Sequence, residues 1–236
     1  MNKNSNTYTV IYISCIVLAV GAVLALAAMA LKPKQQQNAD ADKMKQILAS
    51  VHITPAEDAV IEDFGKYITG QCVVNTRGEV IGDDAFGVDV AAQSKVKDAD
   101  SRLLPIYECT LPGEGGIKYI IPAYGTGLWG PIWGYIAIDS DGSTVYGAYF
   151  SHQGETPGLG AEIQEPWFGK QFVGKELFHG DSFAPIQVVK KGNKPVGDAD
   201  YVDAVSGGTI TSKGVSAMLD DCLRPYKVYL KSLRNK

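Results

Sequence analysis

The sequence predicts an α+β protein in which a single N-terminal transmembrane helix precedes a domain with an antiparallel sheet and flanking helices. Residues 9–31 carry no charged side chain, which predicts the transmembrane helix. Between residues 104 and 150, short segments rich in β-branched and aromatic residues predict strands. Apolar residues at helical spacing follow over residues 213–226. Because these strands and the later helix form separate runs and do not alternate, the domain belongs to the α+β class.

The composition is that of a globular protein without a nucleic-acid surface. Of the 236 residues, 45% are hydrophobic and 20% are charged, so the chain can bury a core. The formal net charge is -4, and no cluster of Lys and Arg suggests a nucleic-acid partner. We expect an anchor over residues 1–35, a membrane-proximal region of helices and strands over residues 36–102, and the main domain over residues 103–236.

The cysteines and histidines do not predict a metal site. Cys15, Cys72, Cys109 and Cys222 form no C-x-x-C pair, and the three histidines lie far apart in the sequence. Cys15 falls in the apolar N-terminal stretch. The other three could form one disulfide with a spare thiol or remain buried thiols, and the sequence leaves both alternatives open.

The N-terminal stretch favours an uncleaved membrane anchor over a signal peptide. A helix over the 23 residues 9–31 extends roughly 34 Å, which is long enough to cross a hydrocarbon core. Residues 28–30 resemble a cleavage site, but Lys3 is the only basic side chain before the stretch, and the apolar core is longer than that of a signal peptide. Lysines on both sides leave the orientation open. The lack of charge also predicts that no ion path uses this helix.

Helices and strands are predicted along the rest of the chain. Residues 35–40 predict a polar linker and residues 42–50 a short helix, and Thr54 predicts the N-cap of a second helix. An Asp-Gly turn is expected within residues 139–143, and residues 88–102 are polar and irregular. The predicted strands cover residues 71–75, 79–81, 104–110, 117–121, 132–138 and 145–150.

A glycine-containing segment, residues 203–212, leads into the predicted C-terminal helix. Thr211 or Ser212 could cap a helix that begins near Lys213, and a capped helix entry explains the segment without any ligand. Alternatively, a phosphate esterified to Thr209 would lie near the helix N-terminus, whose free N–H groups and partial positive charge suit an anion. A threonine hydroxyl is a weak nucleophile, so another protein would have to make that bond.

The same segment resembles the flavinylation signature Asp-x-x-Ser/Thr-Gly-Ala-Thr. In proteins with this signature, a dedicated flavin transferase uses FAD to join FMN to the last threonine through a phosphoester bond. The resemblance implies covalent FMN on Thr209, and it assigns further cofactor-binding roles to Asp203, Ser206, Gly207, Gly208 and Thr211. Gly208 stands where the signature has alanine, which is a small and conformationally permissive change.

A second segment, residues 152–163, contains a Pro-Gly turn after the last predicted strand. It resembles the Glu-Thr-Pro-Gly-Leu-Gly element of FMN-binding domains, in which this loop packs along the isoalloxazine. The resemblance implies hydrogen bonds from Thr156 and from backbone amides near Leu159 and Gly160, with apolar contact from Leu159. The cofactor-binding residues that it assigns are Glu155, Thr156, Gly158, Leu159 and Gly160.

A third segment, the glycine-rich loop predicted over residues 123–134, contains two tryptophans. It does not match G-x-G-x-x-G between a strand and a helix, so no dinucleotide fold is predicted. A small aromatic core is one interpretation. Its Gly-x-Gly-Leu-Trp sequence also resembles the C subunits of sodium-translocating NADH:quinone oxidoreductases. That resemblance implies that Leu128 and Trp129 lie at the flavin, where Trp129 stacks near the ring or shapes its pocket.

Together the three segments identify the chain as a member of that subunit family, which is related to the G subunit of the Rnf complex. The resemblance implies a single-pass protein of the bacterial inner membrane, with its FMN-binding domain (residues 103–236) on the periplasmic or outer side. The FMN would relay electrons between a membrane iron–sulfur centre and a covalent FMN of a neighbouring subunit. The whole complex would oxidise NADH, reduce ubiquinone and transport sodium.

The resemblance also implies partners. These would be the other subunits of the membrane complex, the flavin transferase during maturation, and membrane lipid. No catalytic residue and no independent turnover are expected of the isolated chain. Two alternatives remain open. One is an Rnf-type G subunit with the same covalent FMN, against which Leu128 and Trp129 argue. The other is an anchored extracytoplasmic binding or assembly module without flavin.

Overall fold

The protein forms two compact units in a computed structural model that describes residues 6–234. The units are Met1–Lys43 and Met44–Lys236. The first is helical, and the second holds the sheet and all the segments expected to bind a cofactor. The predicted α+β class with a long apolar N-terminal helix is confirmed.

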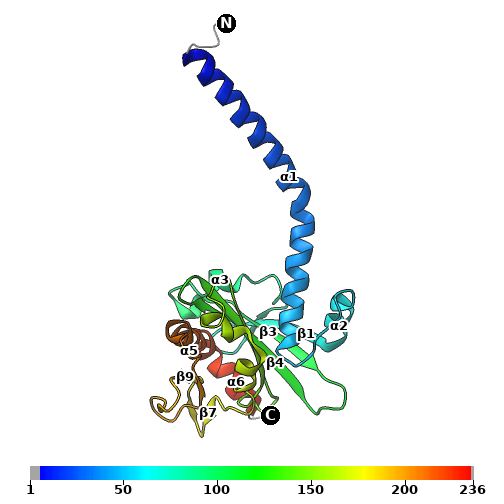
Figure 1. The fold of residues 1–236 in the computed structure, drawn as a ribbon. Helices are drawn as coiled ribbons and strands as arrows, with labels where there is room; N and C mark the ends of the chain where they lie inside the picture. The colour runs from blue at the N-terminus through cyan, green and yellow to red at the C-terminus, as the bar shows by residue number, and fades with distance from the viewer. Residues whose placement is uncertain (1–5, 235–236) are drawn as a thin grey trace. The chain divides into compact units, whose positions relative to one another are not determined.

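One long helix, α1 (Asn6–Ala49), makes up the described part of the first unit, and its residues 44–49 belong to the second (Figure 1). The prediction of a polar linker over residues 35–40 is wrong, because the helix runs through it and includes the short helix predicted at residues 42–50. Gln, Ala and Lys are good helix formers, and Gln36 Nε2 donates to Asp40 Oδ1 at 2.8 Å one turn later.

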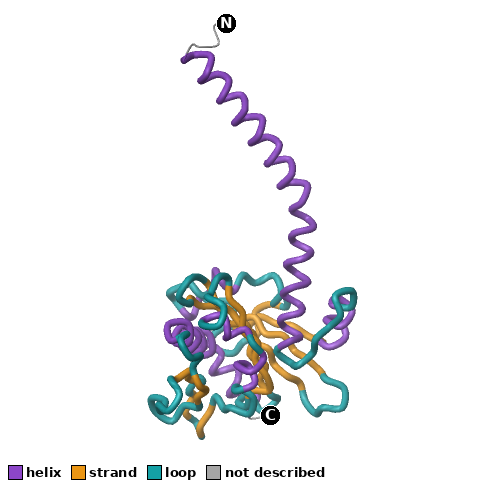
Figure 2. The backbone as a smooth tube through the Cα atoms, in the orientation of Figure 1, coloured by secondary structure: helices purple, strands orange, loops and turns teal. Residues whose placement is uncertain are grey.

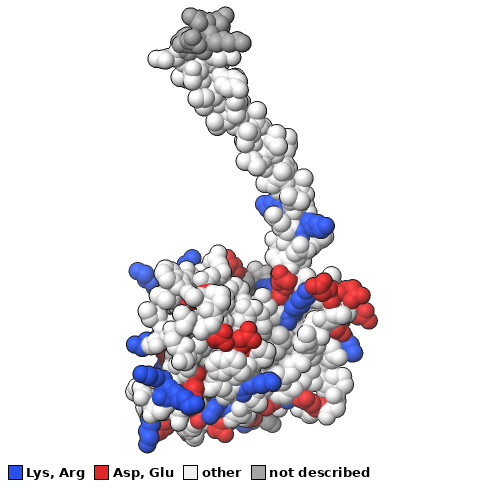
Figure 3. Space-filling model, in the orientation of Figure 1, with Lys and Arg blue, Asp and Glu red and all other residues white. Residues whose placement is uncertain are grey.

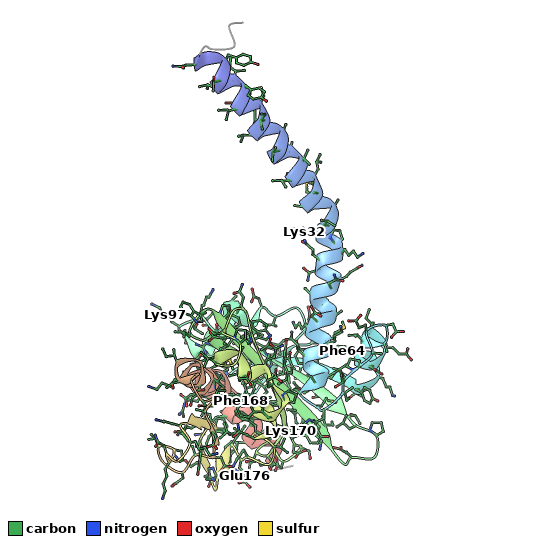
Figure 4. All side chains as sticks on the ribbon, viewed as in Figure 1. Lys32, Phe64, Lys97, Phe168, Lys170 and Glu176 are labelled. Atoms are coloured by element: carbon green, nitrogen blue, oxygen red, sulfur yellow. The ribbon has the colours of Figure 1, made fainter. Side chains whose placement is uncertain are left out.

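The apolar part of α1 has the character of a membrane span. Within residues 6–234, α1 is the one helix that is long and apolar enough to cross a membrane. Its apolar side chains before Lys32 are exposed, with Leu18 and Met29 each at 73%. Figure 3 shows this part of the helix without charged side chains, and Figure 4 labels Lys32 where charge first appears. Such a surface is stable in lipid rather than in water, so α1 fits a single-pass anchor.

The second unit is built on a six-stranded sheet (Figure 2). All five strand pairings are antiparallel. All six predicted strands are present, and the first two, from residues 36–102, pair directly with the rest. In sheet order the strands are β2 (Val80–Gly82), β1 (Ile68–Val74), β3 (Leu104–Thr110), β4 (Ile117–Thr126), β5 (Pro131–Ile138) and β6 (Val145–His152).

The β4–β5 hairpin corrects the prediction for residues 123–134. They do not form an extended glycine-rich loop, because β4 continues to Thr126 and β5 begins at Pro131. Tyr124 pairs with Trp133 across the two strands, and the aromatic pair supports the ladder despite the neighbouring glycines. The Asp-Gly turn between β5 and β6 is confirmed, with Gly142 at a φ of 68°.

Each face of the sheet has its own hydrophobic core. Adjacent strand residues point to opposite faces, so Ile121 belongs to one core and Ile120 to the other. The first core includes Leu219 from the C-terminal helices and Phe168, which Figure 4 labels inside the domain. The second core includes Ile47 from the last turns of α1. Hydrophobic cores therefore pack on both faces of the sheet and hold the strands that carry the β4–β5 loop.

Helix α2 (Val60–Tyr67) begins later than predicted. Thr54 is not its N-cap, since the helix follows Ala59, which has no side-chain cap. The Ala59 N–H donates to Ala56 O at 3.1 Å, so a turn occupies the place of the expected first helical turn. The irregular region 88–102 contains two short helices, α3 (Val90–Gln93) and η1 (Ala99–Ser101).

Short elements fill the chain between β6 and the C-terminal helices. Two pairs of strands form there, and the β9–β10 pair is parallel, which the sequence did not predict. The elements in order are η2 (Gly160–Gln164), α4 (Pro166–Lys170), β7 (Phe178–His179), β8 (Ser182–Phe183), β9 (Gln187–Val189), β10 (Tyr201–Asp203), α5 (Thr209–Leu223), η3 (Arg224–Tyr226) and α6 (Lys227–Arg234).

The four cysteines are free thiols, so the disulfide alternative is not found, and of the three thiols in the other alternative Cys72 is only half-buried. Cys109 and Cys222 are buried, and burial raises the pKa of each thiol to about 11. Within residues 6–234, no group of His, Cys, Asp and Glu side chains is arranged to hold a metal ion.

Candidate cofactor site

The buried carboxylate of Glu155 joins the three segments whose sequences resemble flavin-binding motifs. Glu155 follows β6 and is only 5% exposed. Its Oε1 accepts a hydrogen bond from the backbone N–H of Trp129 at 2.8 Å, and its Oε2 accepts one from the Thr211 hydroxyl at 2.6 Å. One side chain thus ties the β4–β5 loop and the first turn of α5 to the loop after β6.

Two glycines make room for this carboxylate. A Cβ atom on Gly127 would lie 2.5 Å from Glu155 Oε1. A Cβ atom on Gly160 would overlap both Glu155 Oε2 and Thr211 Oγ1. Separations this short are not compatible with a side chain, so the close approach of the three segments depends on glycine at both positions.

Thr209 is the first residue of α5 and its side chain is exposed. This corrects the prediction that the helix begins near Lys213 with Thr211 or Ser212 as its cap. The Thr211 hydroxyl donates to Glu155, and Ser212 Oγ instead accepts the Val205 N–H at 3.1 Å, so both side chains point into the fold. The helix can therefore begin earlier, after Gly208, and no side chain caps it.

The loop before α5 uses its two glycines differently. Gly207 has a φ of 76°, a conformation that favours glycine. Gly208 has a φ of -98° and a ψ of 39°, so its φ is in the ordinary negative range. A Cβ atom on Gly208 would approach Val205 Cγ1 at 3.1 Å and Gly160 Cα at 3.3 Å, which is close but can be relieved by small shifts. Alanine thus fits at 208 far better than at 207.

Three exposed apolar side chains belong to the joined segments. Leu128 is 46% exposed, Trp129 is 68% exposed and Leu159 is 42% exposed. Leu159 packs against the loop before Thr209, since a Cβ atom on Gly207 would lie 2.5 Å from Leu159 Cδ2. Apolar side chains on segments joined to the one with an exposed hydroxyl suit a ligand with a flat ring at one end and a phosphate at the other.

The loop of residues 156–161 is a compact turn. The N–H groups of Leu159 and Ala161 each donate to Thr156 O at 3.1 Å, and Gly158 takes a φ of 73°. The Leu159 amide, expected to face the flavin, is therefore already bonded within the loop. The Thr156 side chain is exposed, and a Cβ atom on Gly208 would lie 3.3 Å from Gly160 Cα.

Asp203 and Ser206 complete the predicted segment. Asp203 ends β10, and its backbone is held on both sides by Gln171. The Asp203 N–H donates to Gln171 Oε1 at 3.0 Å, and Gln171 Nε2 donates to Asp203 O at 3.3 Å. Ser206 is exposed in the following loop. No sequence pattern indicates this role of Gln171.

A cavity of about 430 Å³ borders Thr209, and no sequence pattern predicts it. One wall is the loop after β9, and the other runs from Ala204 to Lys213. The walls meet because β9 and β10 pair in parallel. Each strand has only three residues, which is too short a pattern to identify from the sequence.

Comparison with known proteins gives the class of the fold and site. The FMN-binding domain family matches residues 127–224, a range that includes Trp129, Glu155 and Thr209. The joined segments, the exposed apolar side chains and the exposed threonine fit this match. The fold and the site thus define an FMN-binding domain.

Relatives over the whole chain give the particular family. The C subunit of the Na(+)-translocating NADH-quinone reductase of Vibrio anguillarum is 33% identical over 233 residues, covering 93% of this chain and 91% of that protein. The crystal structure of the C subunit from Parabacteroides distasonis is 46% identical with a TM-score of 0.77, covering 85% of this chain and 96% of that one. The NqrC structure from Shewanella oneidensis, 24% identical with a TM-score of 0.69, covers 84% of this chain and 100% of that one and shares the fold. The chain belongs to the family of C subunits of Na(+)-translocating NADH-quinone reductases.

Proposed function

We propose that this chain is an electron-transfer subunit of a sodium-translocating NADH:quinone oxidoreductase and carries FMN bonded covalently to Thr209. The observation that carries the proposal is the arrangement around Glu155. Its two hydrogen bonds, at 2.6 and 2.8 Å, join the three flavin-related segments beside an exposed Thr209.

FMN, when bound, supplies the capacity to accept and release electrons one or two at a time. The chain's own residues hold and position it. Thr209 Oγ1 would be the ester oxygen, and Leu128, Trp129 and Leu159 would provide apolar contact to the ring. The exposed hydroxyl of Thr156 is available to bond the cofactor. Glu155 and Thr211 would act indirectly, by fixing the loops that carry these contacts.

Attachment requires an external enzyme. A threonine hydroxyl needs a base or metal for activation, and within residues 6–234 no candidate metal group is present. We propose that a flavin transferase uses FAD as the donor. The bond from Thr209 Oγ1 to the FMN phosphorus forms, the P–O–P bond breaks, and AMP leaves with the bonding electrons. The hydroxyl proton passes to a base of the transferase. Exposure of Ser206, Gly207 and Thr209 makes the segment accessible to that enzyme.

The proposal also assigns a place in the cell. The helix α1 would anchor the chain in lipid of the bacterial inner membrane, with the FMN-binding domain on the periplasmic or outer side. There the flavin would relay electrons between a membrane iron–sulfur centre and a covalent FMN on a neighbouring subunit. The exposed apolar side chains near Thr209 would help bring the cofactor close to such a partner.

The test is flavin fluorescence in a denaturing gel after coexpression of the full chain with its flavin transferase. The wild type and the control variant Thr54→Val should fluoresce, because Thr54 is exposed and lies outside the three segments expected to bind the cofactor. Thr209→Val should be dark. A dark wild type with an active transferase on a control substrate would contradict covalent attachment and favour a module without flavin.

A further inference from the structure

The cavity beside Thr209 is lined by four lysines. Lys190, Lys191 and Lys194 come from the loop after β9, and Lys213 lies one helical turn beyond Thr209 on α5. The deeper lining is apolar and includes Val188 and Val205, both buried. Of the described residues that line the cavity, none is acidic.

These four lysines form no direct ion pair with a carboxylate of residues 6–234. In the described part of the chain, the ion pairs within 4.0 Å involve other lysines and arginines. In Figure 3, Lys and Arg side chains gather at the lower left of the domain, where Figure 1 draws β9. Four like charges around one cavity repel one another, and a bound anion would reduce that repulsion.

The walls of the cavity are held by hydrogen bonds. The Val188 N–H donates to Ser216 Oγ at 3.2 Å, which fixes β9 to α5. The Ala204 N–H donates to Val189 O at 2.7 Å, which closes the parallel pair. Within the lysine loop, the Asn193 N–H donates to Lys190 O at 2.8 Å. These hydrogen bonds hold β9 and the start of the lysine loop beside the segment that contains Thr209.

We infer that this four-lysine cavity is a phosphate-binding site that receives the phosphate of the flavin nucleotide joined to Thr209. The identity of the nucleotide rests on the proposed function, whereas the phosphate chemistry rests on the lysines alone. A phosphodiester on Thr209 keeps one negative charge, and a dinucleotide donor carries two. The lysines of the cavity would thus bind the phosphates of the donor before transfer and the phosphodiester afterwards. The apolar side chains of Leu128, Trp129 and Leu159 would contact the isoalloxazine ring.

The site is tested by non-covalent binding to the full chain with Thr209→Val, purified in detergent, so that no ester can form. Flavin fluorescence is followed on titration with FMN and with riboflavin, which has the same ring and no phosphate. FMN should bind about tenfold more tightly or better, the factor expected from one charge-assisted hydrogen bond. Raising the salt concentration should weaken FMN binding and leave riboflavin binding unchanged.

Charge variants then locate the site. In the same background, Lys190→Gln with Lys191→Gln and Lys194→Gln should abolish the preference for FMN over riboflavin. A matched control, Lys95→Gln with Lys97→Gln and Lys227→Gln, removes the same charge from exposed positions elsewhere and should keep the preference. Competition tests whether the site binds phosphate independently of the flavin ring. AMP and inorganic pyrophosphate should displace FMN without displacing riboflavin.

Several outcomes would overturn the inference. These are equal affinities for FMN and riboflavin, no saturable FMN binding at millimolar concentration, or an FMN preference that survives in the lysine variant. The result is separate from flavinylation of the wild type. If Thr209→Val prefers FMN but the wild type carries no covalent flavin, the phosphate-binding site stands and the covalent attachment is contradicted. If the wild type carries covalent flavin but Thr209→Val shows no FMN preference, the covalent attachment stands and the phosphate-binding site is contradicted.

Discussion

The two glycines before Thr209 show how a single position decides whether a signature can vary. Gly207 has a φ of 76° and packs against Leu159, so it cannot carry a side chain without strain. Gly208 has a φ of -98° and closest Cβ approaches of 3.1–3.3 Å. The sequence therefore departs from the flavinylation signature at Gly208, where the fold tolerates both glycine and alanine.

We predict that Gly208→Ala keeps flavinylation and changes the free energy of unfolding by no more than about 1 kcal/mol, since lower unfolded-state entropy offsets the tight contacts. Gly207→Ala should cost about 1–2 kcal/mol from its backbone conformation alone and should lose flavinylation. Urea unfolding and in-gel fluorescence measure both effects. Equal behaviour of the two variants would show that the loop conformation does not control attachment.

Glu155 gives the second residue-scale prediction. Its removal leaves the Trp129 N–H and the Thr211 hydroxyl without their acceptor. Glu155→Ala should lower the free energy of unfolding by about 1–3 kcal/mol, the cost of unsatisfied buried groups. Glu155→Gln should lose less, because the amide oxygen can still accept and the Thr211 hydroxyl can turn to accept from the amide.

Thermal unfolding of these variants is compared with Glu165→Gln, a carboxylate exposed on the nearby surface, which should match the wild type. If Glu155→Ala unfolds like the wild type, Glu155 does not join the three segments in solution.

At the scale of elements, the sequence predicts most strands and hairpins but not the helix boundaries. Strands such as β3 and β5 were predictable because dense apolar and β-branched residues fix them locally. The junction at residues 35–40 was not, because its three glutamines are polar and yet good helix formers, and α1 continues through it. The start of α5 was missed because Thr211 bonds to Glu155, which is distant in the sequence, and Ser212 accepts the Val205 N–H from the preceding loop instead of capping the helix.

The continuity of α1 leads to an element-scale prediction. Its last turns belong to the core of the second unit, where Leu48 is 0% exposed. Leu48→Ala should destabilise the domain by about 2–5 kcal/mol, because it leaves a cavity. Leu18→Ala, in the same helix but 73% exposed, should leave domain stability unchanged. Urea unfolding followed by tryptophan fluorescence in detergent distinguishes them, and similar values for both would place the end of α1 outside the core.

At the scale of the whole molecule, the motifs were visible in the sequence but their connection was not. Trp129, Glu155 and Thr211 come from three separate segments, and only the folded sheet brings them together. The four-lysine cavity likewise depends on the β9–β10 pairing and had no pattern of its own. The resemblance to known families predicted FMN as the cofactor, whereas the fold explains physically why these loops meet.

The proposed orientation predicts the labelling of Val196→Cys, a position that is 84% exposed. In spheroplasts, a membrane-impermeant maleimide should label it before lysis, because the proposed orientation places the domain outside. Asn6→Cys, at the other end of α1, should be labelled only after lysis. Burial raises the pKa of Cys72, Cys109 and Cys222, so these native thiols should react slowly at neutral pH. Labelling in the reverse order would place the domain in the cytoplasm.

The proposed bond between FMN and Thr209 is tested most directly by peptide mass spectrometry of the wild-type chain coexpressed with its transferase. The tryptic peptide that ends at Lys213 also contains Ser206, Thr211 and Ser212, so fragmentation must locate the modification. We expect one FMN phosphoryl group, carried by Thr209 alone. An unmodified peptide from a flavinylation-competent cell, or FMN on any other residue, would contradict the proposed attachment.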